Sequence, residues 1–248
     1  MFDDLKGQVV VVTGGVTGIG GAASLGFAAA GAKVVAQYFG GGDELKAIEA
    51  AGITALRLDL TDSGAPTTLI EAALKAHGRI DVLVNNAGSL VARTALTDLD
   101  DDFMDKVFNL NCRQLVHCCR LAAVAMKEQR SGNIINVTSI AARQGASPGG
   151  SVYAGAKAFV SAFTKTIAKE LVDYNIRVNC VSPGTIHTAF HDRFSTAEKR
   201  AATAKTIPMQ RLGVADDCTG TFLYLASNAA SGYVTGQVIE VNGGQLMP

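Results

Sequence analysis

The sequence predicts an α/β fold with a single doubly wound parallel sheet and helices on both faces. Apolar runs of strand length alternate with helical patterns along the 248 residues. Short connections between alternating strands and helices favour a parallel sheet that is covered on both sides. Polar motifs follow most of the strands, as expected where ligands lie at the carboxyl ends of parallel strands.

The first predicted elements are a buried strand, a glycine loop and a helix. Val9–Val12 are β-branched residues, which suit a strand covered on both faces. Residues 13–20 are rich in glycine, and residues 21–30 have the alanine-rich composition of a helix. Glycine lets the backbone approach a phosphate, and a helix N-terminus attracts negative charge. These residues predict an anion site, with an ordinary tight turn as the alternative.

The remaining elements follow from apolar periodicity and from the turn residues between them. Further strands are predicted at residues 33–39, 53–60, 80–84, 133–137 and 176–181, with a seventh within 233–241. Helices are predicted at residues 43–51, with Asp43 as N-cap, at 67–76 and at about 101–130, and a further helix contains Tyr153 and Lys157 and continues to about residue 173. Without a linker or repeat, we expect one domain over residues 1–248. Residues 185–210 depart from the alternation, and we expect them to form a lid over the substrate.

Composition excludes several classes of function. The 22 basic and 22 acidic residues balance, so charge gives no reason to expect a nucleic-acid or membrane partner. No apolar run is long enough to cross a bilayer, and residues 1–4 lack the features of a signal peptide, so we expect a cytoplasmic protein. The five cysteines lack paired spacing and are expected to be buried thiols. His187 and His191 alone have a helical metal-ligand spacing, and no metal site is expected.

Several motifs, in a fixed order, carry a resemblance to a known family. They are Thr13-Gly14-x-x-x-Gly18-x-Gly20, Asn85-Asn86-Ala87-Gly88, Asn111, Ser139, Tyr153-x-x-x-Lys157 and Pro183-Gly184. Each motif alone is weak, but together and at these separations they are specific. Over essentially its whole length the chain resembles a short-chain dehydrogenase/reductase of the classical type. The resemblance implies a Rossmann fold, a nicotinamide dinucleotide, and hydride exchange between an alcohol and a carbonyl.

The residues Tyr153 and Lys157 suit acid–base chemistry on an alcohol. Removing a hydride from an alcohol requires a base for the hydroxyl proton, and the reverse reaction requires the matching acid. A spacing of four places both side chains on one face of a helix. A nearby ammonium favours the phenolate, so we expect Lys157 to lower the pKa of Tyr153 from its reference value of about 10. The resemblance adds that Lys157 holds the nicotinamide ribose. An amphipathic helix with a solvated lysine is the alternative.

Ser139 and Asn111 complete the catalytic set that the resemblance implies. Ser139 follows a strand and would bond the substrate oxygen, with an ordinary helix-cap or turn serine as the alternative. It precedes Tyr153 by 14 positions, about one more than the family pattern, so Thr138 is the fallback and the loop 144–151 would absorb the extra residue. Asn111 would interrupt its helix and hold a water that links the lysine to solvent, with Asn109 as the rival.

The resemblance also assigns the residues around the dinucleotide. Asn85 and Gly88 would line the adenosine and ribose side, Asp59 would meet the adenine amino group unless it is only a turn residue, and Ile186 would bond the carboxamide through its backbone. The full expected set is Gly14, Thr17, Gly18, Ile19, Gly20, Tyr38, Phe39, Asp59, Leu60, Asn86, Ala87, Gly88, Tyr153, Lys157, Pro183, Gly184, Ile186 and Thr188.

The choice between NAD and NADP rests on the end of the second strand. An acid there selects NAD by bonding the ribose 2′-hydroxyl, whereas arginine accepts the 2′-phosphate of NADP. The acid position falls on Tyr38, and Phe39 and Thr17 stand where basic residues are often found. Without an acid to repel the phosphate, and with backbone N–H groups in residues 40–42, the sequence slightly favours NADP.

The residues expected around the substrate are comparatively polar. Apolar walls would suit a steroid or a long acyl chain, so a small hydroxyl-rich substrate is favoured, as in bacterial sugar and polyol dehydrogenases. The polar residues of these segments are Arg143, Gln144, His187, His191 and Arg193.

Two other functions remain open at this point. A 3-oxoacyl carrier-protein reductase would need a basic patch for its acidic partner, and only Lys199, Arg200 and Lys205 are candidates. A catalytically idle nucleotide-binding module is disfavoured by the intact serine, tyrosine and lysine. The resemblance further implies a homotetramer, to whose interface the apolar residues 238–248 are suited.

Overall fold

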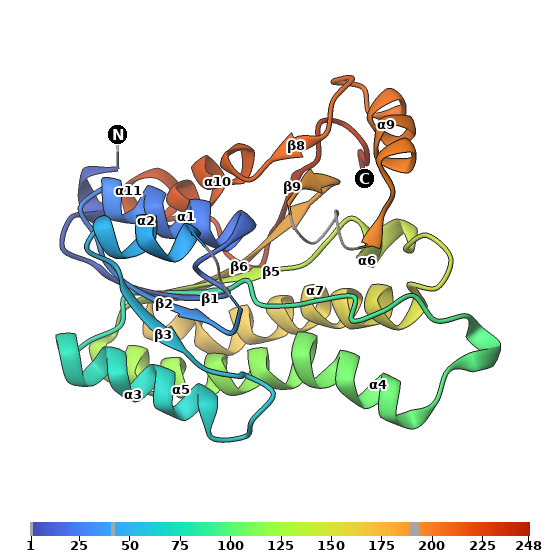
Figure 1. Ribbon diagram of the computed structural model, residues 1–248. Coiled ribbons are helices and arrows are strands. Elements are labelled where there is room, and N and C mark those ends of the chain that lie inside the picture. The colour runs from blue at the N-terminus through green and yellow to red at the C-terminus, as the bar shows by residue number, and fades with distance from the viewer. Residues whose placement is uncertain (1, 41–42, 189–193) are drawn as a thin grey trace.

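Seven parallel strands form the central sheet of the computed structural model, which describes residues 2–40, 43–188 and 194–248 (Figure 1). The strand order is β3-β2-β1-β4-β5-β6-β9, and the predicted doubly wound α/β fold is confirmed. The strands are β1 (Val9–Thr13), β2 (Lys33–Tyr38), β3 (Thr54–Arg57), β4 (Val82–Asn85), β5 (Gly132–Val137), β6 (Ile176–Pro183) and β9 (Val238–Val241).

The order of the strands reverses beside β1. Val11 pairs with Val35 of β2 on one side and with Leu83 of β4 on the other. The chain runs outward from β1 to β2 and β3, and then crosses back to β4 on the opposite side. At such a reversal the connections leave in opposite directions and open a crevice at the carboxyl ends of the strands.

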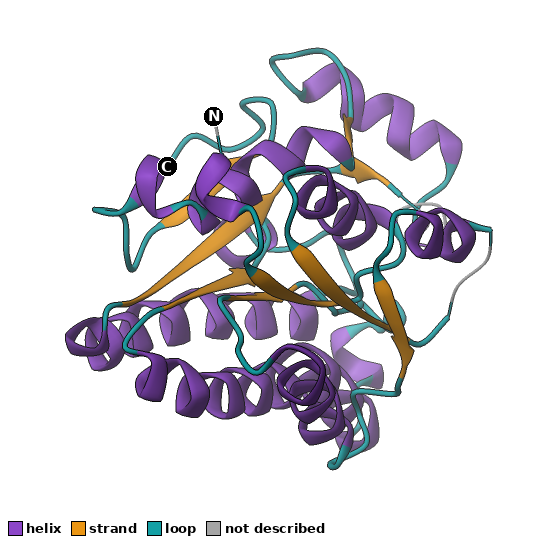
Figure 2. Ribbon diagram, turned by 90° about the vertical axis from the view of Figure 1, so that its left-hand side faces the viewer, coloured by secondary structure: helices purple, strands orange, loops and turns teal. Residues whose placement is uncertain are grey.

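Two layers of helices cover the sheet (Figure 2). One layer encloses a core that includes Phe27, Ile48 and Phe222, and the other encloses a core that includes Leu69 and Leu115. The first layer contains α1 (Gly18–Ala29), α2 (Glu44–Ala50), α10 (Asp216–Ala226) and α11 (Asn228–Ser231). The second contains α3 (Ala65–His77), α4 (Asp101–Phe108), α5 (Gln114–Gln129) and α7 (Ser151–Leu171).

The excursion after β6 is built from short elements. Strand β7 (Ile186–His187) pairs in parallel with β8 (Gly213–Val214), and α9 (Ala197–Thr206) lies between them in the chain. Residues 189–193 of the expected lid lie outside the described residues. The short helix α6 (Ala141–Gln144) follows β5 and faces this region.

Three local expectations differ from the structure. Helix α10 was not predicted, although Cys218, Phe222 and Leu225 have helical spacing and are buried. The helix expected over 101–130 is divided by a π-helical turn, Asn109–Arg113, between α4 and α5. Asp43 precedes α2 but makes no side-chain cap bond, because its carboxylate instead contacts Lys46 at 3.4 Å.

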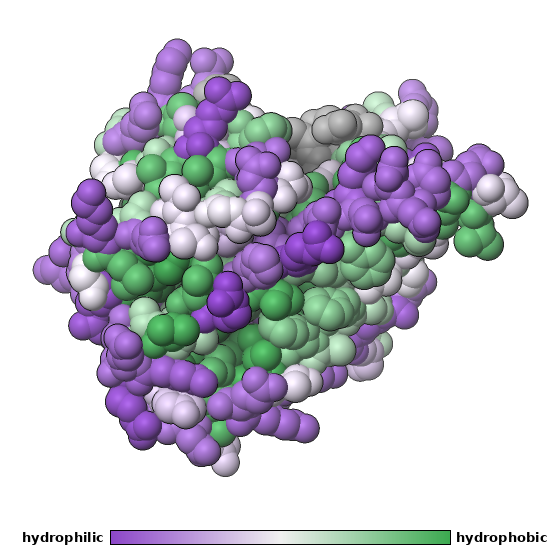
Figure 3. Space-filling model, turned by 90° about the horizontal axis from the view of Figure 1, so that it is seen from below, coloured by the Kyte–Doolittle hydropathy of each residue, from purple (hydrophilic) through white to green (hydrophobic). Residues whose placement is uncertain are grey.

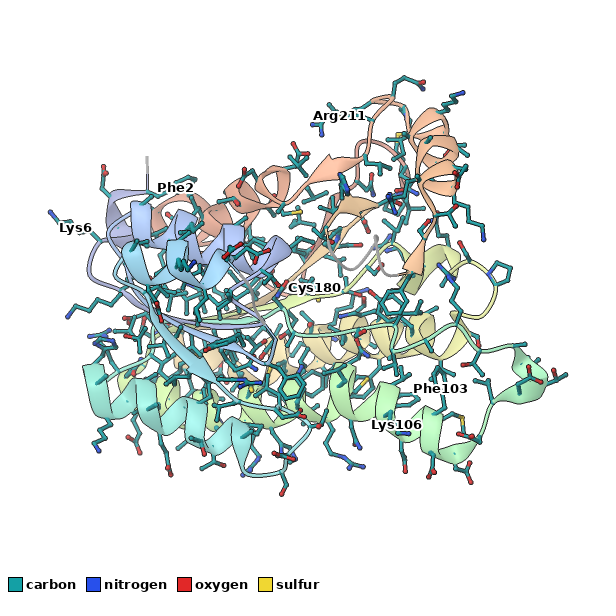
Figure 4. The ribbon with its side chains drawn as sticks, viewed as in Figure 1. Phe2, Lys6, Phe103, Lys106, Cys180 and Arg211 are labelled. Carbon is teal, nitrogen blue, oxygen red and sulfur yellow. The ribbon has the colours of Figure 1, made fainter. Side chains whose placement is uncertain are left out.

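The five cysteines are buried and unpaired. Figure 4 shows Cys180 in the interior, on strand β6 between the two helix layers. Among the described residues, no three His, Cys, Asp or Glu side chains are gathered as metal ligands. No helix in the described ranges has both the length and the apolarity needed to cross a membrane.

Candidate active site

A cavity of about 600 Å³ lies at the carboxyl ends of the strands, a volume typical of ligand sites. Gly14 and Gly18 line one end, Ser139 and Tyr153 line the middle, and Thr203 of α9 lines the far end. The structure thus brings together residues that the sequence separates by nearly 190 positions.

The glycine loop leaves the N-terminus of α1 open toward this cavity. Gly14 and Gly18 have φ values of +61° and +54°, which side-chain-bearing residues rarely adopt. Thr17 is the N-cap of α1 but makes no side-chain cap bond. Thr17, Gly18 and Ile19 all line the cavity. The first-turn N–H groups therefore remain available to an anion, which fits the pyrophosphate of a dinucleotide.

Gly20 does not line the cavity, contrary to expectation, and has a structural reason to be glycine. A Cβ at this position would collide with Gly14 O and with the Asn86 side chain. The Asn86 amide uses this space to donate hydrogen bonds to Thr13 O and Gly14 O, both at 3.1 Å. Gly20 thus allows the loop after β4 to brace the loop after β1.

Gln37, and not the expected Tyr38, lines the cavity at the end of β2. The Tyr38 side chain packs on the core beneath α1 and α2, because alternate residues of a strand face opposite sides. Gln37 is 3% exposed and lines the cavity. Its Oε1 accepts a hydrogen bond from Gly14 N at 2.9 Å, and its Nε2 donates to Leu58 O at 2.6 Å. The buried Gln37 amide therefore holds Gly14, the first glycine of the loop, in place. The position of Gln37, one residue before the end of its strand, is the single sequence signal that could have suggested this role.

The adenosine end has an exposed aromatic wall. Phe39 lines the cavity and is 61% exposed, and Leu60 also lines it. Asp59 lines the cavity too, while its Oδ1 accepts bonds from the N–H and the hydroxyl of Thr61 at 2.9 and 2.7 Å. Asp59 is therefore both a turn residue, bonded to Thr61, and part of the cavity wall.

A basic residue that sequence reasoning missed lies beside this wall. Arg57 pairs with Tyr38 in the parallel register of β2 and β3, so the two residues are neighbours. Its Nε donates to Phe39 O at 3.2 Å, and its side chain is exposed. No signal local to β2 could have revealed it, because the two strands are paired only in the folded sheet.

The loop after β4 is held by β1. The hydroxyl of Thr13 accepts hydrogen bonds from the N–H groups of Asn86 and Ala87, both at 3.0 Å. Asn86, Ala87 and Gly88 line the cavity. Asn85 does not line it. Its side chain is buried and donates to Asn136 Oδ1 at 2.8 Å, which joins β4 to β5.

Tyr153 and Lys157 lie one turn apart on α7, and both line the cavity. Lys157 is 3% exposed, and its Nζ donates to Val137 O at 2.9 Å. Burial lowers the pKa of Lys157 to about 8 and raises the pKa of Tyr153 to about 12. The expectation of a lowered tyrosine pKa is therefore wrong, because desolvation by burial outweighs the hydrogen bond with Ser139 that lowers it.

Ser139, rather than Thr138, faces Tyr153. A hydrogen bond with the Ser139 side chain opposes the rise in the pKa of Tyr153. The Thr138 hydroxyl points away, into the protein, where it donates to Lys157 O at 2.7 Å. Gly145 and Gly149, with φ of +79° and +81°, turn the loop between α6 and α7.

Asn111 lies in the π-helical turn, fully buried, and does not itself line the cavity. Its Nδ2 donates to Ser89 O and Val107 O, both at 2.8 Å, and its Oδ1 accepts from Ser89 N at 3.1 Å. A Cβ on Gly88 would lie 2.7 Å from Asn111 Oδ1 and 3.0 Å from Lys157 Nζ. Asn111 thus packs the Gly88 loop against the lysine, whereas the rival Asn109 is only partly buried.

The remaining expected residues divide into three groups. Pro183, Gly184, Ile186 and Thr188 line the cavity, as does Gln144. His187 is exposed and does not line it, because it alternates with Ile186 on β7. His191 and Arg193 lie outside the described residues. Thr185 and Thr203, from the excursion expected over the substrate, also line the cavity, whereas Leu90, Arg93 and Gln245 are lining residues that sequence reasoning missed.

The cavity suits a nicotinamide dinucleotide. It has an open helix N-terminus for the pyrophosphate, crowded glycines that admit no side chain, and a wall formed by Pro183, Gly184 and Ile186 beside Tyr153. Residues 7–245 match a family model described as enoyl-(acyl carrier protein) reductase.

Similar proteins agree with this assignment. The chain is 36% identical to a 3-oxoacyl-[acyl-carrier-protein] reductase of Synechocystis sp., with 98% of each chain covered. It is also 36% identical to 3beta-hydroxysteroid dehydrogenase 1 of Eggerthella lenta, with 100% of this chain and 97% of the other covered. A solved structure of the NADH-dependent reductase A1-R′, complexed with NAD, is 34% identical with a TM-score of 0.88, and each chain is covered over its whole length. The chain belongs to the classical short-chain dehydrogenase/reductase family and is an NAD(P)-dependent oxidoreductase that acts on CH–OH groups.

Proposed function

We propose that this oxidoreductase acts on a small hydroxyl-rich substrate of the sugar or polyol type and prefers NADP. The polar lining at the substrate end of the cavity carries the proposal. Beyond Ser139 and Tyr153, this end presents the side chains of Gln144, Thr185 and Thr203. The Thr185 and Thr203 hydroxyls donate within the protein, to Gln245 Oε1 and Lys199 O, so their oxygens are left to accept hydrogen bonds from a hydroxyl-rich ligand.

Tyr153, Ser139 and Lys157 would perform the proton chemistry. A nicotinamide dinucleotide, when bound, would supply the chemistry of hydride transfer. The Tyr153 hydroxyl gives a proton to the carbonyl oxygen during reduction and takes it back during oxidation. Ser139, already bonded to this hydroxyl, orients the substrate oxygen and stabilises its developing charge. Lys157 is charged below its pKa of about 8 and favours the phenolate when the proton leaves.

The preference for NADP is supported by Arg57. Its guanidinium lies beside Phe39 and Tyr38, where NAD-selective relatives of this fold carry an acid. Among the described residues, no carboxylate is within ion-pair distance of it. A guanidinium without an acidic partner is well suited to a 2′-phosphate.

Equilibrium binding of 2′,5′-ADP and 5′-AMP tests this preference. The wild type should bind 2′,5′-ADP more tightly, and Arg57→Ala should remove about tenfold of that affinity and leave 5′-AMP unchanged. Arg120→Ala on α5 is the matched control. A kcat/KM much higher with NAD than with NADP would contradict the preference, and the resemblance to an NADH-dependent reductase makes this comparison informative.

A second candidate is reduction of a 3-oxoacyl group on a carrier protein. Helix α9 favours it, because Lys199 and Lys205 lie on the helix whose Thr203 lines the cavity. An acidic carrier protein would be attracted to such a basic helix. The similarity to a 3-oxoacyl-carrier-protein reductase also supports it.

A substrate screen separates the two candidates. Sugars, polyols and 3-oxoacyl thioesters are each offered with NAD(H) and NADP(H), and kcat/KM is measured. The proposal expects turnover of at least one polyol or sugar, with little for the thioesters. Turnover confined to acyl thioesters would reject the sugar reading in favour of the second candidate.

We further propose a homotetramer. Apolar side chains form a band across the lower helix layer (Figure 3). Met104 and Phe108 of α4 and Phe159 of α7 are exposed large apolar residues, and at the opposite layer Tyr233 is fully exposed. Exposed apolar residues gathered on one face are typical of interfaces between subunits. Light scattering coupled to size-exclusion chromatography should give about four times the 25.7 kDa of one chain, and a monomer would contradict the proposal.

A further inference from the structure

Arg93 is held in place at the substrate end of the cavity by three backbone carbonyls. Its Nε donates to Phe194 O at 3.1 Å. Its Nη1 donates to Pro148 O at 3.1 Å and to Ser147 O at 3.4 Å. These bonds fix the plane of the guanidinium against the segment before α7 and against the excursion, so its position is largely set before any ligand arrives.

The same segment connects Arg93 to Tyr153. Thr94 N donates to Gly149 O at 3.1 Å, and a Cβ on Gly149 would lie 3.0 Å from the Arg93 Cβ. Gly150 then precedes α7, whose first turn carries Tyr153. Arg93 and the tyrosine are therefore positioned by one short, closely packed stretch of chain.

The charges that line the cavity are few and well separated. Among the described lining residues, only Asp59, Arg93 and Lys157 are charged. Asp59 belongs to the adenosine end, and the Lys157 ammonium is buried against Val137 O. Arg93 therefore supplies the positive charge at the substrate end within the part of the chain that the structure describes.

Within the ranges that the structure describes, no carboxylate forms an ion pair with Arg93. Its Nε and Nη1 are bonded to carbonyls, whereas its Nη2 group makes no hydrogen bond with the described residues. A guanidinium fixed on one side and unpaired on the other presents its remaining N–H donors to an anion.

We propose that Arg93 binds an anionic group of the substrate, a carboxylate or a phosphate, on the side of the molecule away from the reacting carbon. The inference deepens the proposed function and rests on it, because it narrows a sugar or polyol substrate to a sugar acid or a sugar phosphate. Ser139 and Tyr153 hold the reacting oxygen, and Arg93 fixes the opposite end of the substrate and so selects its charge.

The experiment compares the affinities of ligands that differ at one terminal group, which is either neutral or anionic. Alditols of glucose, mannose and galactose are titrated calorimetrically into the full-length protein with NADPH present, so that no hydride acceptor is available, next to the corresponding aldonates and alditol 6-phosphates. The aldonates report a carboxylate site and the 6-phosphates a phosphate site. We expect one anionic class to bind at least about tenfold more tightly than its neutral alditols.

Variants of Arg93 then distinguish binding of the anionic group from a purely structural role in holding the neighbouring loops. Arg93→Ala should bring the anionic and neutral ligands to within about twofold of one another, whereas Arg93→Lys should retain part of the difference because it keeps the charge but not the fork. Arg120→Ala is the control and should change neither affinity. Kinetically, Arg93→Ala should raise KM for the anionic substrate far more than it lowers kcat.

Three outcomes would overturn the inference. The first is that no anionic ligand binds more tightly than its neutral alditol. The second is that Arg93→Ala lowers the affinity for the anionic and the neutral ligand equally, and the third is that the difference between the two affinities is unchanged in that variant. The equal loss would mean that Arg93 only ties the loops together. Binding is measured without turnover, so failure of the sugar reading in the substrate screen is recognised separately from failure of this inference.

Discussion

The Lys157 ammonium lies 5.8 Å from the centre of the Tyr153 ring, one helical turn away on α7. Both groups are enclosed, and burial drives each toward its neutral form, so the pKa of Tyr153 rises to about 12 and that of Lys157 falls to about 8. The free protein therefore holds the tyrosine as an acid that is ready to protonate a carbonyl. The lysine is close to losing its own charge at mildly alkaline pH.

Replacing Tyr153 by phenylalanine tests its role as acid and base. The variant keeps the ring that packs near Val152 and Cys112 but lacks the hydroxyl. We expect kcat to fall by about 10²–10⁴-fold, the usual contribution of a positioned acid or base, with the dinucleotide Kd nearly unchanged. Steady-state kinetics and a fluorescence titration of the dinucleotide measure the two quantities. Turnover within tenfold of the wild type would show that another group moves the proton.

The depressed pKa of Lys157 predicts how stability depends on pH. Between about pH 8 and the reference value of 10.5, the unfolded chain binds a proton at this lysine that the folded protein does not. The contribution of Lys157 to stability therefore rises with pH across this window, whereas the five buried cysteines, whose thiol pKa values are raised above 9.0, act in the opposite direction in both the wild type and a lysine variant. A shift of this size corresponds to a change of at most about 3 kcal/mol in the free energy of unfolding, and the part of this change below pH 10 can be measured.

Lys157→Met removes this titration while keeping an extended side chain. Urea unfolding at pH 7 to 10 should show the wild type gaining stability relative to the variant as the pH rises above 8. Tyr153 acts in the opposite direction only above pH 10, because its pKa is raised from 10. Parallel stability curves for the two proteins would contradict the assigned pKa of the lysine.

Gly88 and Gly155 form a matched pair of glycine positions. A Cβ on Gly88 would press on Asn111 Oδ1 and Lys157 Nζ, whereas a Cβ on Gly155 meets nothing within 4 Å. We expect Gly88→Ala to cost about 1–3 kcal/mol of stability and to lower kcat, because the lysine must move. Gly155→Ala should instead stabilise the protein by about 1 kcal/mol with activity unchanged, since alanine favours the helix. Equal effects at the two positions would refute this reading of the site.

Gln37→Leu tests the amide that holds the glycine loop. The variant leaves the Gly14 N–H without its acceptor and Leu58 O without its donor, at a cost of about 1–3 kcal/mol. We expect weaker binding of NAD and NADP by similar factors, because Gln37 shapes the loop and does not touch the 2′-position. Calorimetric titration of both coenzymes measures this. A selective loss of one coenzyme would mean that Gln37 reads the ribose directly.

Much of the site could be predicted from local sequence. The run Val9–Val12 followed by glycines predicts a buried strand and a helix N-terminus, because both depend on neighbouring residues. The spacing of four between Tyr153 and Lys157 places them on one helix face for the same reason. Helix α10 could also have been found, since its buried residues recur at helical intervals.

Other features depended on contacts between distant segments. Arg57 lies beside Tyr38 only because β2 and β3 pair in one register, and Gln37 replaces Tyr38 in the wall because of the side of the sheet it faces. Arg93 is held at the substrate end by hydrogen bonds to the carbonyl oxygens of Pro148 and Phe194, which lie 55 and 101 residues further along the chain.

The sequence by itself determined the fold class and the glycine loop at a helix N-terminus, since local patterns suffice for these. The tyrosine, serine and lysine followed from the family resemblance that the motifs carry together, since each motif alone is weak. The tertiary structure alone decided which way the Tyr153 and Lys157 pKa values move, which residues form the cavity wall, and which described charged side chains lie along it. Those properties depend on burial and on strand register. Both arise only when the whole chain is packed, because desolvation is set by every segment that surrounds a group.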